Sequence, residues 1–176
     1  MSKLSLTGVE RFFREDQIIV SKTDLQGRIS YANDVFLHIA DYTEREVLGQ
    51  PHNLIRHPDM PRCVFKLLWD TVTAGQEIFA YVVNRTKHGD HYWVLAHVTP
   101  TRLQDGTIGG FHSCRRVPSR RAVEKISGLY RTLRGIEEAS ESRKDGQALA
   151  VEALERHLKG LGQRYDQFMF SLIEGK

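Results

Sequence analysis

Three glycine-containing turns divide the first two thirds of the chain into short runs rich in β-branched and aromatic residues. The turns are Asp-Leu-Gln-Gly at 24–27, Lys-His-Gly-Asp at 87–90 and Asp-Gly at 105–106. Glycine accepts a positive φ without steric cost, so such a turn between two β-rich runs predicts a hairpin. The sequence therefore predicts five strands, at residues 17–23, 28–32, 79–86, 91–102 and 108–117.

The segment between the second and third predicted strands has helical signals instead. Asn33 is predicted to cap a short helix, and Thr43 with Glu46 matches a capping box. Asp59 is predicted to cap a longer helix that ends at Gly75. Strands so close in sequence pair antiparallel, and inserted helices can cover one face of their sheet. The expected class is α+β, a five-stranded antiparallel sheet with a helical flank.

The remainder of the chain, residues 118–176, has two apolar stripes with helical spacing. We predict two amphipathic helices separated by a break at Lys-Asp-Gly, residues 144–146, with Gly160 and Gly162 weakening the second helix. Neither helix can bury its stripe alone, so the pair folds back on the sheet, pairs with itself, or pairs with another chain. The predicted segments are an N-terminal cap (1–16), a sheet domain (17–117) and C-terminal helices (118–176).

Charge and composition exclude several classes of protein. A net charge of +3 is too weak to indicate nucleic-acid binding. Cys63 and Cys114 are the only cysteines, which suits a reducing compartment. No run approaches the roughly 20 apolar residues of a membrane span, and the first ten residues lack a signal-peptide core, so we expect a cytoplasmic protein. A basic cluster is interpreted as a solvated linker; it comprises Arg115, Arg116, Arg120 and Arg121.

No catalytic motif is present. The chain has no glycine-rich phosphate loop, no nucleophile elbow and no His-Glu-x-x-His zinc motif, so we expect that it is not an enzyme. The last residues, 171–176, are typical of a frayed natural end, which favours a small complete protein over a fragment of a larger one.

Two longer strings are more specific than the turns. They are Gly-Gln-Pro-His-Asn at 49–53 and Arg-His-Pro-Asp-Met-Pro at 56–61, and they follow Ala-Asn-Asp at 32–34. In this order and spacing they resemble the PAS domain of bacterial aerotaxis receptors, over roughly residues 17–117. The resemblance implies a PAS fold that binds FAD without a covalent bond, and a flavin whose redox state controls the output.

The resemblance also implies the cofactor-binding residues. In such a site Arg56 would pair with phosphate or with negative charge on the reduced ring, and His57 would couple proton uptake to electron uptake. Asn84 would read a ring carbonyl. The residues carried over are Asn33, His52, Arg56, His57, Asp59, Trp69 and Asn84.

The sequence departs from related domains at two places. Aerotaxis domains commonly carry a tryptophan near the start of the third strand, so Phe79 either supplies this aromatic wall or the wall is lost. Photosensory flavin domains place a reactive cysteine where this chain has His52, so no light-driven thiol adduct is expected.

The expected function is a flavin-dependent redox or oxygen sensor that signals through its C-terminal helices, as a homodimer or through a signalling partner. Two alternatives stay open. One is a haem-binding gas sensor with His57 or another helical histidine as ligand. The other is a PAS module without cofactor that serves dimerisation or interaction.

Overall fold

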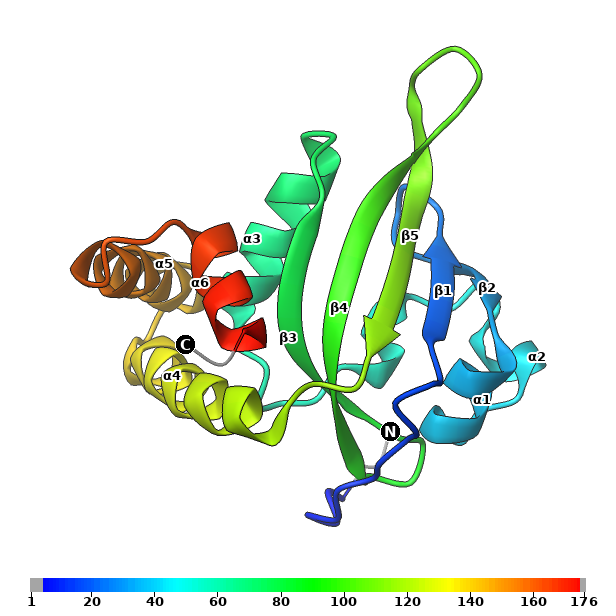
Figure 1. The fold of residues 1–176 in the computed structure, drawn as a ribbon, viewed down its shortest axis with the longest axis horizontal. Helices are drawn as coiled ribbons and strands as arrows, with labels where there is room; N and C mark the ends of the chain where they lie inside the picture. Colours follow the sequence, from blue (N-terminus) through cyan, green and yellow to red (C-terminus); the bar gives the residue numbers. More distant parts are fainter. Residues whose placement is uncertain (1–4, 175–176) are drawn as a thin grey trace.

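The computed structural model describes residues 5–174, so the first four residues of the predicted N-terminal cap and the last two residues of the chain lie outside the described part. Its centre is an antiparallel sheet in the order β2-β1-β5-β4-β3 (Figure 1). All five predicted strands are confirmed, with ends shifted by one or two residues at most. They are β1 (Ile19–Thr23), β2 (Ile29–Ala32), β3 (Ile78–Arg85), β4 (His91–Arg102) and β5 (Ile108–Arg116).

Four helical elements connect β2 to β3; the sequence predicts three of them, and the 3-10 helix is additional. Asn33 caps the first of them by accepting a 3.0 Å hydrogen bond from the backbone N–H of Phe36, and the capping box of Thr43 and Glu46 is present at the second. The elements are α1 (Asp34–Ala40), α2 (Glu44–Val47), the 3-10 helix η1 (His52–Ile55) and α3 (Arg62–Thr73).

The C-terminal segment forms three helices, so the prediction of two is wrong. They are α4 (Arg120–Ala139), α5 (Arg143–Gly160) and α6 (Tyr165–Ile173). The predicted break at 144–146 is instead the first turn of α5, because the Ser142 side chain caps this helix by accepting from the N–H of Asp145. The chain breaks after Gly160, where Gly162 adopts a φ of +65° that favours glycine.

These three helices fold back on the sheet, the first of the arrangements expected for them. Figure 1 shows them together on the β3 side of the molecule. The Tyr130 hydroxyl of α4 donates a 2.6 Å hydrogen bond to the carbonyl of Tyr81 in β3, and the Tyr130 ring stacks on Trp93 in β4. Phe170 of α6 packs on Phe79, with 5.2 Å between ring centroids.

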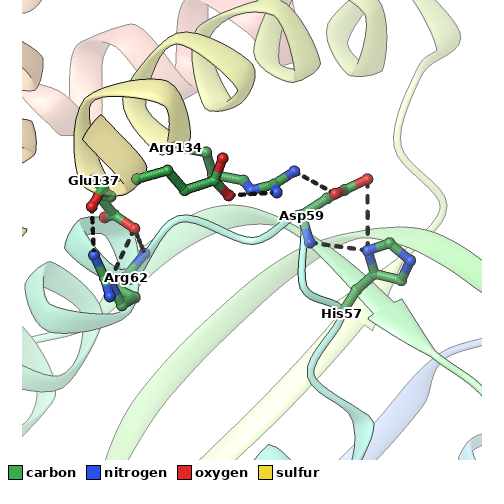
Figure 2. Close-up of polar contacts among 6 residues, drawn as sticks. His57, Asp59, Arg62, Arg134 and Glu137 are labelled. Atoms are coloured by element: carbon green, nitrogen blue, oxygen red, sulfur yellow. Dashed lines mark hydrogen bonds and ion pairs between the residues drawn. The ribbon is translucent and has the colours of Figure 1, made fainter. Parts of the chain in front are cut away.

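The start of α3 differs from the prediction. Pro61 occupies the N-cap position with an extended backbone, which leaves Asp59 outside the helix and without a capping role. The carboxylate of Glu137 from α4 takes this role, because it accepts from the backbone N–H groups of Arg62 (3.0 Å) and Cys63 (2.7 Å). Figure 2 shows this carboxylate against Arg62. The docking of α4 and the start of α3 therefore depend on the same side chain.

Strand pairing fixes which side chains share a face of the sheet. Asn84 lies opposite Tyr92, and Arg115 lies opposite Ala96. Tyr92 and Ala96 are four residues apart on β4, so all four side chains point to one face. Helix α3 and η1 cover this face, while α4 and α6 cover the other near β3. Within the described residues, no helix is both long enough and apolar enough to cross a membrane.

Candidate functional site

A cavity of about 320 Å³ lies between this face of the sheet and helices η1 and α3. Its volume is at the lower end of the range typical of small-molecule sites. We call it the apolar cavity because most of its wall is hydrocarbon. That part of the wall is formed by Phe65, Leu68, Trp69, Val82, Ala96, Val98 and Phe111.

Arg115 lines the apolar cavity, which corrects its interpretation as part of a solvated linker. Its exposed fraction is only 2%, because it points from β5 to the covered face. Its Nη2 donates to Ser21 Oγ (2.6 Å) and to His52 Nε2 (2.7 Å), whereas Nη1 has no hydrogen-bond partner among the described residues. Burial lowers the pKa of Arg115 to about 10, which still leaves it charged at neutral pH. The cavity therefore contains a positive charge with an unused donor.

Asn84 supplies a second unused donor. It is 3% exposed and lines the same cavity from β3; its amide lies beside the Tyr92 side chain, but its Nδ2 makes no hydrogen bond of good geometry within the described part of the chain. A buried donor without a partner costs about 1–3 kcal/mol, so such groups are rare in native proteins. Two of them on one cavity make it a candidate site for a molecule with acceptor groups.

His52 is held at the polar end of the cavity by η1. Its Nε2 lies 3.0 Å from Ser21 Oγ and accepts from Arg115. Burial, and then the charge of Arg115, lower the pKa of His52 to about 3. The imidazole is therefore neutral. Because Nε2 is an acceptor, we assign the ring proton to Nδ1.

Trp69 stands at the mouth of the apolar cavity. Its side chain is 41% exposed, although large aromatic residues are usually more buried than this. Its ring lies 5.1 Å from that of Phe111, at 54°, and reaches over Gly27, where a Cβ atom would meet it at 3.3 Å. The ring thus forms part of the cavity wall.

Phe79 does not form the missing aromatic wall. It points to the opposite face of the sheet, where it stacks on His97 with 4.2 Å between ring centroids. The aromatic part of the cavity wall comes from Phe65, Trp69 and Phe111.

Arg56 lines the apolar cavity and also a second, polar pocket next to it. Its guanidinium lies 4.0 Å from the ring centroid of Phe65, a cation–π arrangement. Its backbone pairs with Asn84 at the edge of β3, and its carbonyl accepts from Arg85 Nε. This residue therefore connects the 53–62 segment to the sheet and to both cavities.

His57 and Asp59 lie outside the apolar cavity. His57 is buried in the wall of the polar pocket, where its Nδ1 accepts from the backbone N–H of Asp59, and burial lowers its pKa. The Asp59 carboxylate forms an ion pair with Arg134 of α4 (Figure 2). These two residues connect the loop before α3 to the C-terminal helices.

Asn33 also lies away from the cavity. Its Oδ1 accepts from the N–H groups of Val20 and Phe36, and its Nδ2 donates to the carbonyl of Ile18. These bonds give Asn33 a structural role. Of the seven residues carried over from the resemblance, the apolar cavity brings together His52, Arg56, Trp69 and Asn84.

The sequence reasoning missed Ser21 and Arg115. A period-two reading of β5 would have found Arg115, because it shares a face with Phe111 and Ser113. Ser21 shares a face with Ile19, which is fully buried.

A five-stranded antiparallel sheet with helices between its second and third strands, closed over a cavity, defines a sensor domain of the PAS class. Residues 29–114 match the model of the PAS fold. A solved light-oxygen-voltage domain, studied with a flavin analogue, has the same fold with a TM-score of 0.56 at 17% identity; the match covers 65% of this chain and 86% of that chain. Residues 29–114 therefore form a domain of the PAS family.

Within this family, the chain is related to the aerotaxis receptor of Escherichia coli (strain K12), with 41% identity over 119 residues. The match covers 68% of this chain but 23% of the receptor. Phototropin-1A of Oryza sativa subsp. japonica is 26% identical over 136 residues, which are 74% of this chain and 15% of that protein. The chain thus spans less than a quarter of these relatives. The resemblance to aerotaxis PAS domains is confirmed.

Proposed function

We propose that this chain is a redox or oxygen sensor that binds a flavin, FAD, in the apolar cavity and does not catalyse turnover. The observation that carries the proposal is the pair of unused buried donors, Arg115 Nη1 and Asn84 Nδ2, on an otherwise apolar cavity. The relation to an aerotaxis receptor, and the likeness in fold to a domain studied with a flavin analogue, support it.

The residues of the cavity fit a flavin ring. The ring has an apolar benzenoid edge and a pyrimidine edge with two carbonyl oxygens, so it needs both hydrocarbon contacts and donors. Asn84 and Arg115 supply the donors, and Trp69 supplies a flat surface at the mouth. When bound, the flavin supplies electron transfer, which no side chain of the cavity can perform.

The protein itself contributes a positive electrostatic potential at the polar end of the cavity. Arg115 keeps its charge there without a carboxylate, because its guanidinium is held by the neutral acceptors Ser21 and His52. An unpaired positive charge in a medium of low dielectric constant favours a ligand that gains negative charge. Arg115 would therefore raise the affinity for the reduced ligand relative to the oxidised one.

The signal would leave through helix α4, which is attached to the loop before α3. A shift of this loop would change the equilibrium between two packings of α4 to α6. We propose that the output of these helices is received in the cytoplasm by a second copy of the chain or by a signalling partner. Four large apolar side chains on α5, α6 and the turn between them are exposed for such contacts: Leu149, Leu161, Phe170 and Ile173.

The test is an absorbance spectrum of freshly purified protein, followed by denaturation and chromatography of the released molecule. We expect flavin bands near about 370 and 450 nm with FAD released. Arg115→Gln should lose most of the bound flavin, whereas the matched control Arg116→Gln, an exposed neighbour, should keep it. A Soret band would favour haem instead. A colourless protein that takes up no flavin on reconstitution would refute the proposal.

A further inference from the structure

The polar pocket lies beside the apolar cavity and has a volume of about 490 Å³. One wall is the 53–62 segment of the sensor domain, and the other is formed by helices α4 and α5. Asn53 and Arg56 line both cavities. The two cavities therefore adjoin at these two residues.

Two of the four arginines in the polar pocket are already paired. Arg62 binds Glu137, through Nε to the carboxylate (3.2 Å) and through Nη2 to the backbone carbonyl (3.0 Å). Arg134 binds Asp59 on one side (Figure 2). On the other side it binds Glu138 at 2.7 Å. The carboxylates of Glu137 and Glu138 are thus occupied.

The other two arginines, Arg56 and Arg143, have no carboxylate partner. Among the residues that the structure describes, neither guanidinium donates a hydrogen bond to protein, and both line this pocket. Burial lowers the pKa of Arg56, the carboxylate charge of Glu137 opposes this shift, and the charges of Arg62 and Arg143 lower the pKa further, so the two arginines that share the pocket repel one another. An anion between the two guanidinium groups would remove this repulsion and supply acceptors to both.

We propose that Arg56 and Arg143 bind a diphosphate group, and that this group belongs to the same flavin nucleotide whose ring occupies the apolar cavity. The assignment of the diphosphate to the flavin nucleotide rests on the proposed function. Guanidinium groups bind phosphate oxygens through two parallel hydrogen bonds, so a pair of them suits a diphosphate with its two negative charges.

This site has a consequence for the output. Arg56 belongs to the sensor domain, whereas Arg143 is the first residue of α5. A diphosphate bound to both would hold α5 against the domain, so binding of the nucleotide and docking of the C-terminal helices would stabilise one another.

The experiment compares riboflavin, FAD and ADP as ligands of the apo-protein, with affinities measured by calorimetry and flavin fluorescence. Riboflavin carries the ring alone, ADP carries the diphosphate without the ring, and FAD carries both. We expect FAD to bind at least about tenfold more tightly than riboflavin. Arg143→Gln should weaken FAD and ADP by about five- to tenfold and leave riboflavin unchanged, as expected for one lost phosphate contact.

The matched control is Arg156→Gln, an exposed arginine about 20 Å further along the same helix, which should leave all three affinities unchanged. Equal affinities for FAD and riboflavin, or an Arg143→Gln variant with full FAD and ADP affinity, would overturn the diphosphate site while the flavin function stands. If ADP binds in a manner that depends on Arg143 and riboflavin does not bind at all, the diphosphate site stands and the flavin function is overturned. Arg143 is exposed, so loss of folding does not obscure the result.

Discussion

Nη2 of Arg115 lies 2.7 Å from Nε2 of His52, and within residues 5–174 no carboxylate is bonded to either side chain. A guanidinium only donates, so the imidazole must accept and must be neutral. Protonation of His52 would place two positive charges in contact within the sheet–helix interior. This pair therefore links the stability of the domain to pH.

We expect the free energy of unfolding to fall as the pH drops from about 6.5 toward 3. The folded-state pKa of His52, about 3, lies below its unfolded value, so the unfolded chain takes up the proton first and acid favours unfolding. One such histidine gives a slope of at most about 1.4 kcal/mol per pH unit. Urea denaturation at pH 7, 6 and 5 measures this slope.

His52→Gln keeps an acceptor for Arg115 but does not titrate, so its slope between pH 7 and 5 should be smaller. A residual slope will remain, because burial also lowers the pKa of His57 and of His112. His57→Gln is the matched comparison. Identical slopes for wild type and His52→Gln would show that His52 is not held neutral in the folded protein.

Arg115→Met should leave the apo-protein at least as stable as the wild type, with a gain of up to about 2 kcal/mol in the free energy of unfolding. Methionine has a similar length and removes a buried charge that lacks a carboxylate, and Ser21 and His52 remain 3.0 Å apart to bond each other. Thermal or urea unfolding without ligand tests this. A loss of more than about 1 kcal/mol would show that Arg115 serves the fold and not the ligand.

Glu137→Ala should lower the free energy of unfolding by about 2–4 kcal/mol, because it leaves two N–H groups at the start of α3 and the Nε of Arg62 without their acceptor. Hydrogen exchange should accelerate in α4 and in the first turn of α3 together. The matched control is Glu138→Ala, whose exposed carboxylate contributes little. Faster exchange in α4 alone would contradict the shared role of Glu137.

Gly146→Ala should destabilise the protein by about 1–3 kcal/mol, the opposite of the usual effect in a helix. A Cβ atom at Gly146 would lie 2.6 Å from the backbone carbonyl of Glu137, so α4 and α5 would have to move apart. At Gly135 of α4 a Cβ meets nothing within 4 Å, and Gly135→Ala should stabilise by about 0.5–1 kcal/mol. A lower melting temperature for Gly146→Ala and a higher one for Gly135→Ala would confirm the close contact between Gly146 and the Glu137 carbonyl. Shifts of the same sign in both variants would refute it.

The sheet was predictable because its signals are local. Each turn carries a glycine at a positive φ, such as Gly27 at +76°, Gly89 at +96° and Gly106 at +83°, and the runs between them are rich in β-formers. The extra helix at the C-terminus was missed because the apolar stripe continues past Gly160, and only the φ of +65° at Gly162 turns the chain.

The site was only half predictable, because its polar end is assembled from distant strands. Arg115 lies among arginines that suggest a solvated surface; the alternation along β5 places it on the covered face, but its partners Ser21 and His52 come from β1 and η1. Similarly, Asp59 has the right residue type and place to cap α3, yet the cap comes from Glu137, more than seventy residues later. No local pattern contains such a contact.

Strand β3 lies at one end of the sheet, and its outer rim is occupied at two points. The Tyr81 carbonyl accepts from Tyr130, and the backbone of Asn84 pairs with Arg56. An uncovered rim of this kind is a template for strand addition and for aggregation. Any motion that moves α4 away from β3 would therefore expose unpaired backbone groups on this edge strand, and a second chain could then pair with them. Release of the helix and recruitment of a partner would then be one event.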